Sequence, residues 1–346
     1  MTTETGTIAF LGRGHMGAPM AKNLVQAGYD VRAFDVVPAA VEAISASGVP
    51  TASSAIEAVR GASVVLTMFP GGQQLLDAYR GVDGPGLLDS VDADTVFLDC
   101  STINVDDARE AAGLAVEAGH RSVDAPVSGG VVGAEAGTLT FMIGALEADL
   151  ESVRPLLEVM GGKLVHCGDH GAGQAAKVCN NMILGVSMIA ASEAFVLGEK
   201  LGLSNQALYD VVSTASGQCW AVTTNCPVPG PVPTSPANRD YEPGFAGALM
   251  AKDLGLAMSA IESTGVAAEL GPMAARIYER FRDEGGAGRD FSGIITGIRD
   301  RSHRSARPAG PARAQHRPMT ATVRGPFTPR SHRRRDGSGR GSRSVR

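Results

Sequence analysis

The stretch Thr7-Ile-Ala-Phe-Leu-Gly-Arg-Gly-His-Met-Gly17 decides the fold. An apolar run ends at a glycine, two more glycines complete the spacing Gly-x-Gly-x-x-Gly, and an apolar helical pattern begins at the last of them. A strand, a glycine loop and a helix in this order are typical of a dinucleotide-binding unit. The first glycine permits the tight turn, the second lets the backbone approach a pyrophosphate, and the third permits close helix packing. We therefore expect the phosphates of a dinucleotide to bind at Gly12, Arg13, Gly14, His15, Met16 and Gly17.

A carboxylate at the end of the next predicted strand indicates which dinucleotide binds. Asp35 closes the apolar run 30–35 and lies 23 residues after Gly12. A carboxylate there accepts hydrogen bonds from both ribose hydroxyls of NAD and repels a 2′-phosphate. The following residues, Val36-Val37-Pro38, offer no arginine to hold such a phosphate. The sequence predicts NAD rather than NADP, and a glycine-rich turn without a ligand is the alternative.

The first half of the chain alternates short apolar runs with helical patterns. Apolar residues recur at spacings of three and four in 16–27 and 105–118, between runs that are rich in β-branched and aromatic residues. This alternation predicts a parallel sheet wound on both faces, a Rossmann-type fold. The predicted strands are 7–12, 30–35, 63–69 and 95–100, and a further pair, 137–144 and 163–168, extends the sheet.

The pattern changes after residue 168. One long helix is predicted over 173–200, apolar all round its middle and therefore buried between other elements. Further helical segments follow, and six prolines stiffen the loop 227–243 into a positioned wall. We expect an NAD-binding domain over 1–168 and a mostly α-helical C-terminal domain for substrate and dimerisation over 169–300, joined by the long interdomain helix. The other predicted helices are 205–214, 245–263 and 270–282.

The net charge of −5 hides an uneven distribution. Residues 301–346 contain 13 arginines and one acid, so the rest of the chain carries a charge of −17. This last segment lacks apolar periodicity, and we expect it to be disordered. It is interpreted as a non-functional extension, and the alternative is an arm that binds polyanions such as nucleic acid nonspecifically.

Cysteine usage and the N-terminus bear on location. Five cysteines without a Cys-x-x-Cys pair favour a reducing, cytoplasmic setting. The polar start does not have the pattern of a secretory signal. The charge-free stretch 178–192 has 15 residues, fewer than the ~20 of a membrane span. We expect a soluble homodimer or homotetramer without a metal site, because the histidines and cysteines do not follow a ligand spacing.

Four separated motifs resemble those of the β-hydroxyacid dehydrogenase family. They are Phe10-Leu-Gly-Arg-Gly-His-Met-Gly-Ala-Pro-Met-Ala-Lys-Asn-Leu24, Asp124-Ala-Pro-Val-Ser-Gly-Gly130, Gly171-Ala-Gly-Gln-Ala-Ala-Lys-Val-Cys-Asn-Asn181 and Lys252-Asp-Leu254. The resemblance extends from Thr7 to about Arg299 and implies an NAD-dependent enzyme with a small 3-hydroxy acid substrate. Within the family, 217–220 and 226–233 are most similar to members that oxidise 3-hydroxyisobutyrate to methylmalonate semialdehyde in valine catabolism. The family usually has an apolar residue where this chain has Arg13.

The resemblance implies that Lys177 is the catalytic acid/base and that Asn181 binds substrate. Both lie at spacing four with Gly173 and Gly185 on the predicted long helix, so all four share one stripe. We expect these small neighbours to leave room for a substrate. A lysine base must be desolvated or lie near positive charge, because a free lysine titrates near ~10.4. The alternative is a lysine whose amine extends from a buried helix to solvent.

The same resemblance places two further sets of residues. Ser128, Gly129 and Gly130 would cradle the substrate carboxylate, since the glycines expose backbone N–H groups. Pro70 and Thr102, each after a predicted strand, and Lys252 would line the nicotinamide side of the cofactor. Asp253 either orients a polar group or caps its helix. Cys179 is expected to be a small core residue, and Trp220 to pack on the proline loop or to cap the substrate pocket.

Several other functions are compatible with the fold. A tartronate or succinic semialdehyde reductase is the nearest alternative within the family, and an imine reductase is more distant, since that chemistry commonly lacks lysine at this helix position. A non-catalytic protein that senses NAD, or that binds nucleic acid through the basic tail, is the alternative of another class. Retention of Lys177, Asn181 and Ser128 argues against a binder, which has no need of the full set.

Overall fold

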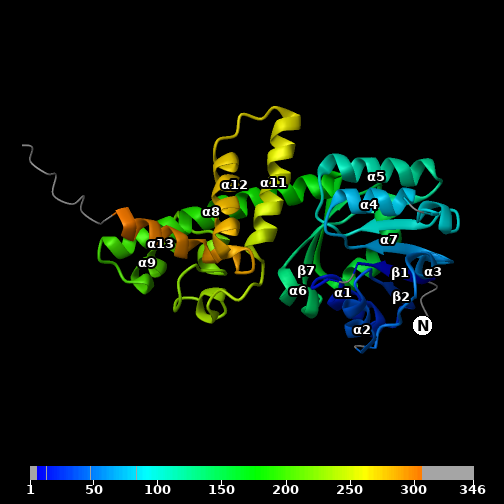
Figure 1. Cartoon of the computed structure of the whole chain (residues 1–346), viewed down its shortest axis with the longest axis horizontal. Coiled ribbons are helices and arrows are strands. Elements are labelled where there is room, and N and C mark those ends of the chain that lie inside the picture. The colour runs from blue at the N-terminus through cyan, green and yellow to red at the C-terminus, as the bar shows by residue number, and fades with distance from the viewer. Residues whose placement is uncertain (1–5, 13, 47, 83, 306–346) are drawn as a thin grey trace, which may run out of the picture. The chain divides into compact units, whose positions relative to one another are not determined.

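The structure, a computed structural model, describes residues 6–12, 14–46, 48–82 and 84–305 (Figure 1). Most of the predicted basic tail and Arg13 lie outside these residues. The described residues up to Arg304 belong to one compact unit. Helix α13 (Ile294–Ser305) includes the first five residues of the predicted tail. The predicted tail boundary at 301 is therefore too early, because the prolines and glycines that end helices start only at Pro308.

An eight-stranded sheet forms the N-terminal part, in the order β2-β1-β3-β4-β5-β7-β6, with β8 paired to β7. The pairs between β1 and β5 are parallel, β7 is antiparallel to β5 and β6, and β8 is parallel to β7. The strands are β1 (Thr7–Leu11), β2 (Val31–Phe34), β3 (Ala62–Thr67), β4 (Val96–Asp99), β5 (Arg121–Asp124), β6 (Val127–Ser128), β7 (Leu139–Gly144) and β8 (Gly161–Gly168).

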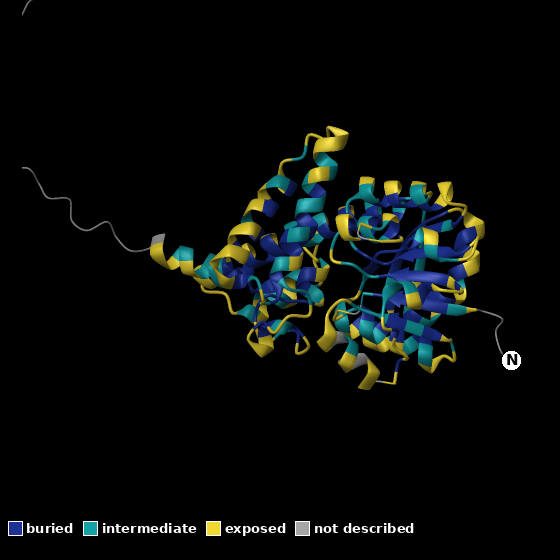
Figure 2. Ribbon diagram, turned by 45° about the vertical axis from the view of Figure 1, so that its right-hand side comes forward, coloured by how far each residue is buried: buried dark blue, intermediate teal, exposed yellow. Residues whose placement is uncertain are grey.

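Helices cover both faces of this sheet, as the alternating pattern predicts. Ile8 and Phe10 of β1 pack into the core under α1, α6 and α7, whereas Ala9 and Leu11 pack into the core under α3, α4 and α5. Figure 2 shows the strands buried between helices whose outer faces are exposed. The doubly wound fold is confirmed. These helices are α1 (Gly17–Gln26), α2 (Pro38–Ala46), α3 (Ala55–Val59), α4 (Gly72–Arg80), α5 (Val105–Glu117), α6 (Gly130–Ala136) and α7 (Glu147–Met160).

Strands β5 and β6 did not appear in the sequence analysis. They have four and two residues, and Ala125-Pro126 separates them. Such short runs carry no periodicity of their own, and their pairing with β4 and β7 makes them strands. Their ends matter because β5 ends at Asp124 and β6 at Ser128.

The C-terminal part is helical and is built around the predicted long helix, observed as α8 (Ala172–Lys200). Buried residues of α8 pack with residues of α10 to α13 in one apolar core. The loop 227–243 is held in place, since Tyr241 donates its hydroxyl to the Pro227 carbonyl at 3.0 Å. The other helices are α9 (Asn205–Val212), α10 (Trp220–Thr223), α11 (Gly247–Thr264), α12 (Leu270–Phe281) and α13, with single turns at Leu88–Ser90, Pro236–Arg239, Arg282–Gly286 and Phe291–Gly293.

Within the described residues, α8 is the one helix whose length and apolar composition would suffice to cross a membrane. It has 29 residues, and half of its most apolar window is buried inside the protein. The charge-free stretch of 15 residues is shorter than the helix itself, which continues past charged residues at both ends. A core helix of a globular domain has the same composition, and α8 packs against α11 and α12.

Candidate active site

Of the three glycines in the loop between β1 and α1, two are crowded by neighbouring backbone and one faces open space. A Cβ on Gly12, which has φ of +86°, would lie 2.4 Å from the Met68 carbonyl oxygen, and one on Gly17 would lie 2.4 Å from the Gly12 carbonyl oxygen. A Cβ on Gly14 would meet nothing within 4 Å. Helix α1 begins without a side-chain cap. The loop therefore fits a phosphate approaching on the Gly14 side, where helix N–H groups need acceptors.

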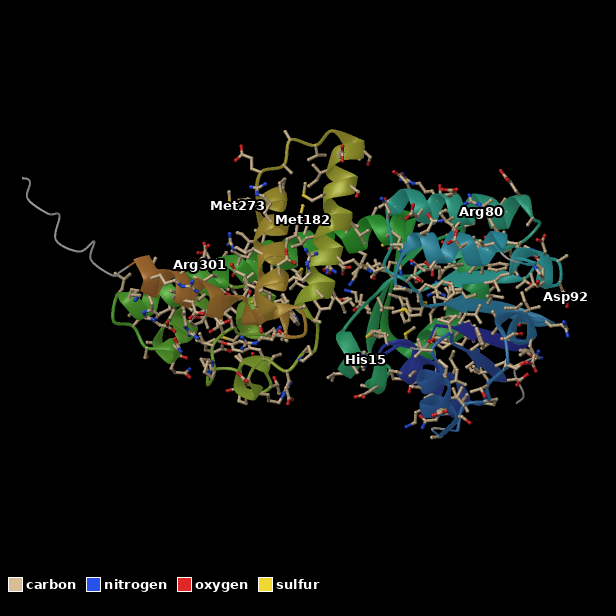
Figure 3. The ribbon with its side chains drawn as sticks, in the orientation of Figure 1. His15, Arg80, Asp92, Met182, Met273 and Arg301 are labelled. Carbon is tan, nitrogen blue, oxygen red and sulfur yellow. The ribbon has the colours of Figure 1, made fainter. Side chains whose placement is uncertain are left out.

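The other predicted cofactor residues of this region lie in the same loop or next to it. His15, labelled in Figure 3, is exposed, and Met16 is half-buried against the core. Asp35 follows β2 directly, and its Oδ1 accepts a hydrogen bond from the Val37 N–H at 2.9 Å. This bond fixes the carboxylate beside the carboxyl end of β2, where the ribose of a dinucleotide binds in such sheets.

Lys177 lies inside the protein. Its side chain projects from α8, the residue is only 7% exposed, and Nζ donates to the Val127 carbonyl at 2.8 Å. Burial lowers the pKa of this amine, the Asp253 carboxylate opposes the shift, and Lys252 adds to it. The alternative of an amine extended to solvent is therefore wrong. A desolvated amine of lowered pKa is suited to accept a proton near neutral pH.

Asn181 is held by polar partners on both sides of its carboxamide. Its Nδ2 donates to Asp253 Oδ2 at 2.5 Å, and its Oδ1 accepts from Asn180 Nδ2 at 2.9 Å. Both Asn181 and Asp253 are buried, and burial raises the pKa of the Asp253 carboxyl, against the influence of Lys252 and Lys177. Of the two roles considered for Asp253, orienting a polar group is the one that the structure supports.

Three residues expected around the nicotinamide come together, although they are distant in the chain. Lys252 Nζ on α11 donates to the Thr102 carbonyl at 2.7 Å and to the Pro70 carbonyl at 3.2 Å. Pro70 follows β3 and Thr102 follows β4, at the edge of the sheet where dinucleotide sheets bind their ligands. The same amine is 3.7 Å from Asp253 Oδ1, and both of these charges act on Lys177, so the residues belong to one cluster.

The segment 128–130 lies next to the lysine. Val127, whose carbonyl accepts from Lys177, directly precedes Ser128, and Gly129 and Gly130 then begin α6 with φ of +137° and +63°. A side chain at either glycine would be strained at these φ values. Gly129 is exposed and Gly130 is half-buried where a carboxylate cradle was predicted; carboxylate binding itself stays a prediction.

Two expectations about the long helix are wrong. Gly173 and Gly185 do not leave room for a substrate, because a Cβ on Gly173 would lie 2.3 Å from the Met142 carbonyl oxygen and one on Gly185 would lie 3.1 Å from Leu254. These glycines allow α8 to pack closely on the sheet and on α11. Cys179 is exposed, because it faces away from the buried stripe.

Comparison with known proteins agrees with this geometry. A family model described as the NAD binding domain of 6-phosphogluconate dehydrogenase matches residues 7–168. A second, described as "NAD-binding of NADP-dependent 3-hydroxyisobutyrate dehydrogenase", matches residues 171–298. The chain belongs to the β-hydroxyacid dehydrogenase family. It is an NAD-dependent hydroxyacid dehydrogenase with an N-terminal Rossmann domain and a helical C-terminal domain.

Relatives in this family differ in their named substrates. A protein of Mycobacterium tuberculosis, named as a probable 3-hydroxyisobutyrate dehydrogenase, is 56% identical over 86% of this chain and 99% of its own length. An NAD-dependent L-serine dehydrogenase of Pseudomonas aeruginosa is 47% identical over 82% of this chain and 95% of its own. A solved structure of Mycobacterium tuberculosis 3-hydroxyisobutyrate dehydrogenase with L-serine has a TM-score of 0.81 and 56% identity, covering 85% of this chain and 99% of that one.

Some functional candidates escaped the sequence analysis. Asp253 was left undecided, although its place in Lys252-Asp-Leu254 was a signal. Gln174 and Asp124 were quoted within motifs without a role, because their contacts join distant segments. Trp220 is 51% exposed, so it is not enclosed by the proline loop.

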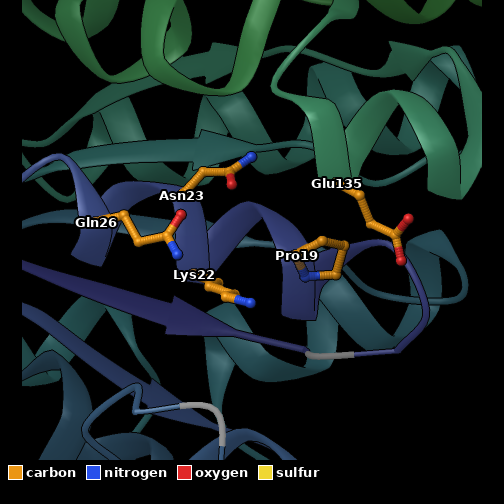
Figure 4. A pocket seen from close by; sticks show the side chains of 5 residues that line it. All are labelled: Pro19, Lys22, Asn23, Gln26 and Glu135. Carbon is orange, nitrogen blue, oxygen red and sulfur yellow. The ribbon is translucent and has the colours of Figure 1, made fainter.

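We considered a pocket and metal sites elsewhere in the described residues as alternatives to this cluster. A pocket lined by Pro19, Lys22, Asn23, Gln26 and Glu135 lies between α1 and α6 (Figure 4). None of the predicted site residues lines this pocket. Among the described residues, no group of three or more His, Cys, Asp or Glu side chains could hold a metal ion.

Proposed function

We propose that this chain catalyses the NAD-dependent oxidation of 3-hydroxyisobutyrate to methylmalonate semialdehyde, a step of valine catabolism. The observation that carries the proposal is the buried amine of Lys177, which donates to the Val127 carbonyl and whose pKa is lowered by burial, against the influence of Asp253. Relatives that bear the name of this enzyme support the choice of substrate.

The reaction removes a hydride from C3 of the substrate and a proton from its hydroxyl. Bound NAD supplies the hydride acceptor. Lys177 Nζ takes the hydroxyl proton as general base, and in the reverse direction its ammonium donates that proton to the aldehyde oxygen. Burial lowers the pKa of this amine, so at a given pH a larger fraction of it is neutral than of a lysine in water.

The substrate carboxylate must be held so that C3 faces the cofactor. We assign this task to Ser128, the backbone of Gly129 and Gly130, and Asn181. The Asp253 carboxylate fixes the orientation of the Asn181 amide through the 2.5 Å hydrogen bond. Because Asp253 lies beside both lysines, it also keeps the cluster from carrying two uncompensated positive charges.

L-Serine is a second candidate substrate, since one relative is named for its oxidation and one related structure was solved with it. It shares the carboxylate and the 3-hydroxyl with 3-hydroxyisobutyrate and has an ammonium in place of the methyl group. Values of kcat/KM for 3-hydroxyisobutyrate, L-serine, glycerate and 4-hydroxybutyrate decide between them. We expect 3-hydroxyisobutyrate to have the highest kcat/KM. A higher value for L-serine, or for glycerate or 4-hydroxybutyrate, which stand for the alternative reductases of the family, would overturn the assignment.

We also propose that the chain forms a homodimer or homotetramer. Large apolar side chains are exposed on the helices of the C-terminal part, including Met273 on α12 (Figure 3). A second copy would bury them, as symmetric oligomers commonly do. Light scattering on the purified protein tests this, and a monomer at micromolar concentration would contradict it. The exposed apolar residues are Ile183, Leu197, Leu249, Leu270 and Met273.

We also propose that the protein is cytoplasmic and that the basic tail is not needed for turnover. All five cysteines are free, which supports a cytoplasmic setting, and cell fractionation tests it.

Deletion of 306–346 tests the non-catalytic alternative: the enzyme is expected to keep its turnover. If the deletion removed the turnover or abolished binding to a nucleic acid that the full chain holds tightly at physiological salt, the tail would have a function.

A further inference from the structure

Gln174 is completely buried, and both ends of its carboxamide are used. Its Nε2 donates to the Ser101 carbonyl at 2.7 Å, and its Oε1 accepts from the Ile103 N–H at 3.2 Å. These two groups stand on either side of Thr102, whose carbonyl accepts from Lys252. One side chain from the first turn of α8 therefore holds the loop that follows β4.

The backbone of the same residue is fixed by a carboxylate from the sheet. Asp124 at the end of β5 accepts from the Gly171 N–H at 2.6 Å and from the Gln174 N–H at 3.0 Å. The N-cap residue of α8 is Gly171, which has no side chain to cap the helix, so Asp124 supplies the missing cap.

Two glycines leave the space that the Asp124 carboxylate occupies. A Cβ on Gly144 would lie 2.3 Å from its Oδ1, and one on Gly173 would lie 2.8 Å from its Oδ2. Burial raises the pKa of Asp124 to about 6, and the two backbone hydrogen bonds oppose this shift. A carboxylate buried at this cost needs compensation, which the N–H groups at the helix start provide.

We propose that Gln174 is a positioning residue for the cofactor and for Lys177. Through its carboxamide, it fixes the Thr102 loop to α8, and Lys177 follows it by three residues on the same helix. The Asp124 carboxylate holds the other end of this connection on β5. The part of the proposal that concerns Lys177 rests on the proposed function, whereas the part that concerns the Thr102 loop rests on NAD binding.

The test is NADH affinity and the pH profile of turnover in Gln174→Met. Methionine has nearly the same size and lacks both hydrogen-bonding groups, so the fold should form. We expect the Kd for NADH, measured by fluorescence titration, to rise about tenfold. The acidic limb of the kcat profile for oxidation should shift, because the base must be unprotonated and Lys177 would lose its fixed burial. Gln174→Glu keeps the acceptor for Ile103, and burial favours its protonated form, which can donate to the Ser101 carbonyl. It should give a smaller change and serves if the methionine variant does not fold.

Two control variants separate positioning from general destabilisation. Gln206→Met changes an exposed glutamine whose side chain bonds Asp210 on α9. Tyr278→Phe removes a buried hydrogen bond to the Phe291 carbonyl in the helical core. We expect neither to change the Kd for NADH or the pH profile, even where Tyr278→Phe lowers Tm as much as Gln174→Met does.

The outcomes are distinguishable. If Gln174→Met bound NADH like the wild type, or if Tyr278→Phe weakened NADH binding equally, the positioning role would be overturned. If the wild type bound NADH but oxidised none of the 3-hydroxy acids, the proposed function would fail, and the NADH titration would still test the connection between Gln174 and the Thr102 loop.

Discussion

The glycine loop 12–17 and the helix stripe 173–185 both carry glycines beside residues of the site, yet the glycines act differently. At Gly14 the missing Cβ faces open space, whereas at Gly173 it would lie 2.3 Å from a backbone oxygen of β7. The first glycine leaves space for a ligand, and the second brings a helix against a sheet. Spacing alone cannot distinguish these uses, because the difference depends on what lies opposite.

The polar members of the stripe should show the largest effect. Lys177→Ala removes the proposed general base, and we expect kcat to fall about 10³-fold while NADH still binds. Steady-state kinetics and fluorescence titration measure the two quantities. Turnover within tenfold of the wild type would remove Lys177 from its role.

Alanine at the two contrasting glycines tests the comparison itself. Gly173→Ala forces a Cβ against the Met142 carbonyl, and we expect a loss of about 3 kcal/mol in the free energy of unfolding. Gly14→Ala meets no protein atom and should change stability by less than about 0.5 kcal/mol. It should instead weaken NADH binding, by about tenfold, because the methyl group occupies the side left for the phosphate.

Urea unfolding and NADH titration of both variants complete this test, with Gly185→Ala as a matched control. A Cβ at Gly185 meets flexible side chains of Leu254 and Met250 at 3.1 to 3.3 Å, so its cost should be intermediate. Equal stability of Gly173→Ala and Gly14→Ala would show that the two regions do not differ as described.

The crowding at Gly173 comes partly from Asp124, and it gives stability a pH dependence. The pKa of Asp124 rises from 3.8 to about 6 on folding, so the folded state holds its proton more tightly. This contribution is fully present below about pH 4 and is lost as pH rises through 6, by up to about 3 kcal/mol. The free energy of unfolding of the wild type minus that of Asp124→Asn should fall over this window. A difference independent of pH would contradict the buried carboxylate.

Asp35 sharpens the ligand side of the comparison with a smaller effect. Asp35→Ser removes the carboxylate that is expected to accept from the ribose and to repel a 2′-phosphate. We expect the preference for NAD over NADP, measured as a ratio of kcat/KM, to fall about tenfold. An unchanged ratio would show that this carboxylate does not read the ribose.

The sequence allowed the parts of this molecule that depend on local pattern to be predicted. The strand, glycine loop and helix at 7–26, and the long helix at 172–200, follow from apolar periodicity. The meeting of Pro70, Thr102 and Lys252 was implied by family resemblance, and Lys252 does contact both carbonyls. Residues acting through long-range contacts were not predicted: Asp253 reaches Asn181 across 72 positions, and Gln174 reaches Ser101 across 73.

The pKa of the Lys177 amine tests the central claim most directly. Lysine side chains labelled with ¹³C at Cε can be titrated by NMR in the wild type, and the resonance missing in Lys177→Met identifies Lys177. The account predicts titration below the ordinary value of 10.5, because the amine is buried beside Lys252. Titration at or above that value would show an amine that is solvated or dominated by Asp253, and it would contradict the assignment of Lys177 as general base.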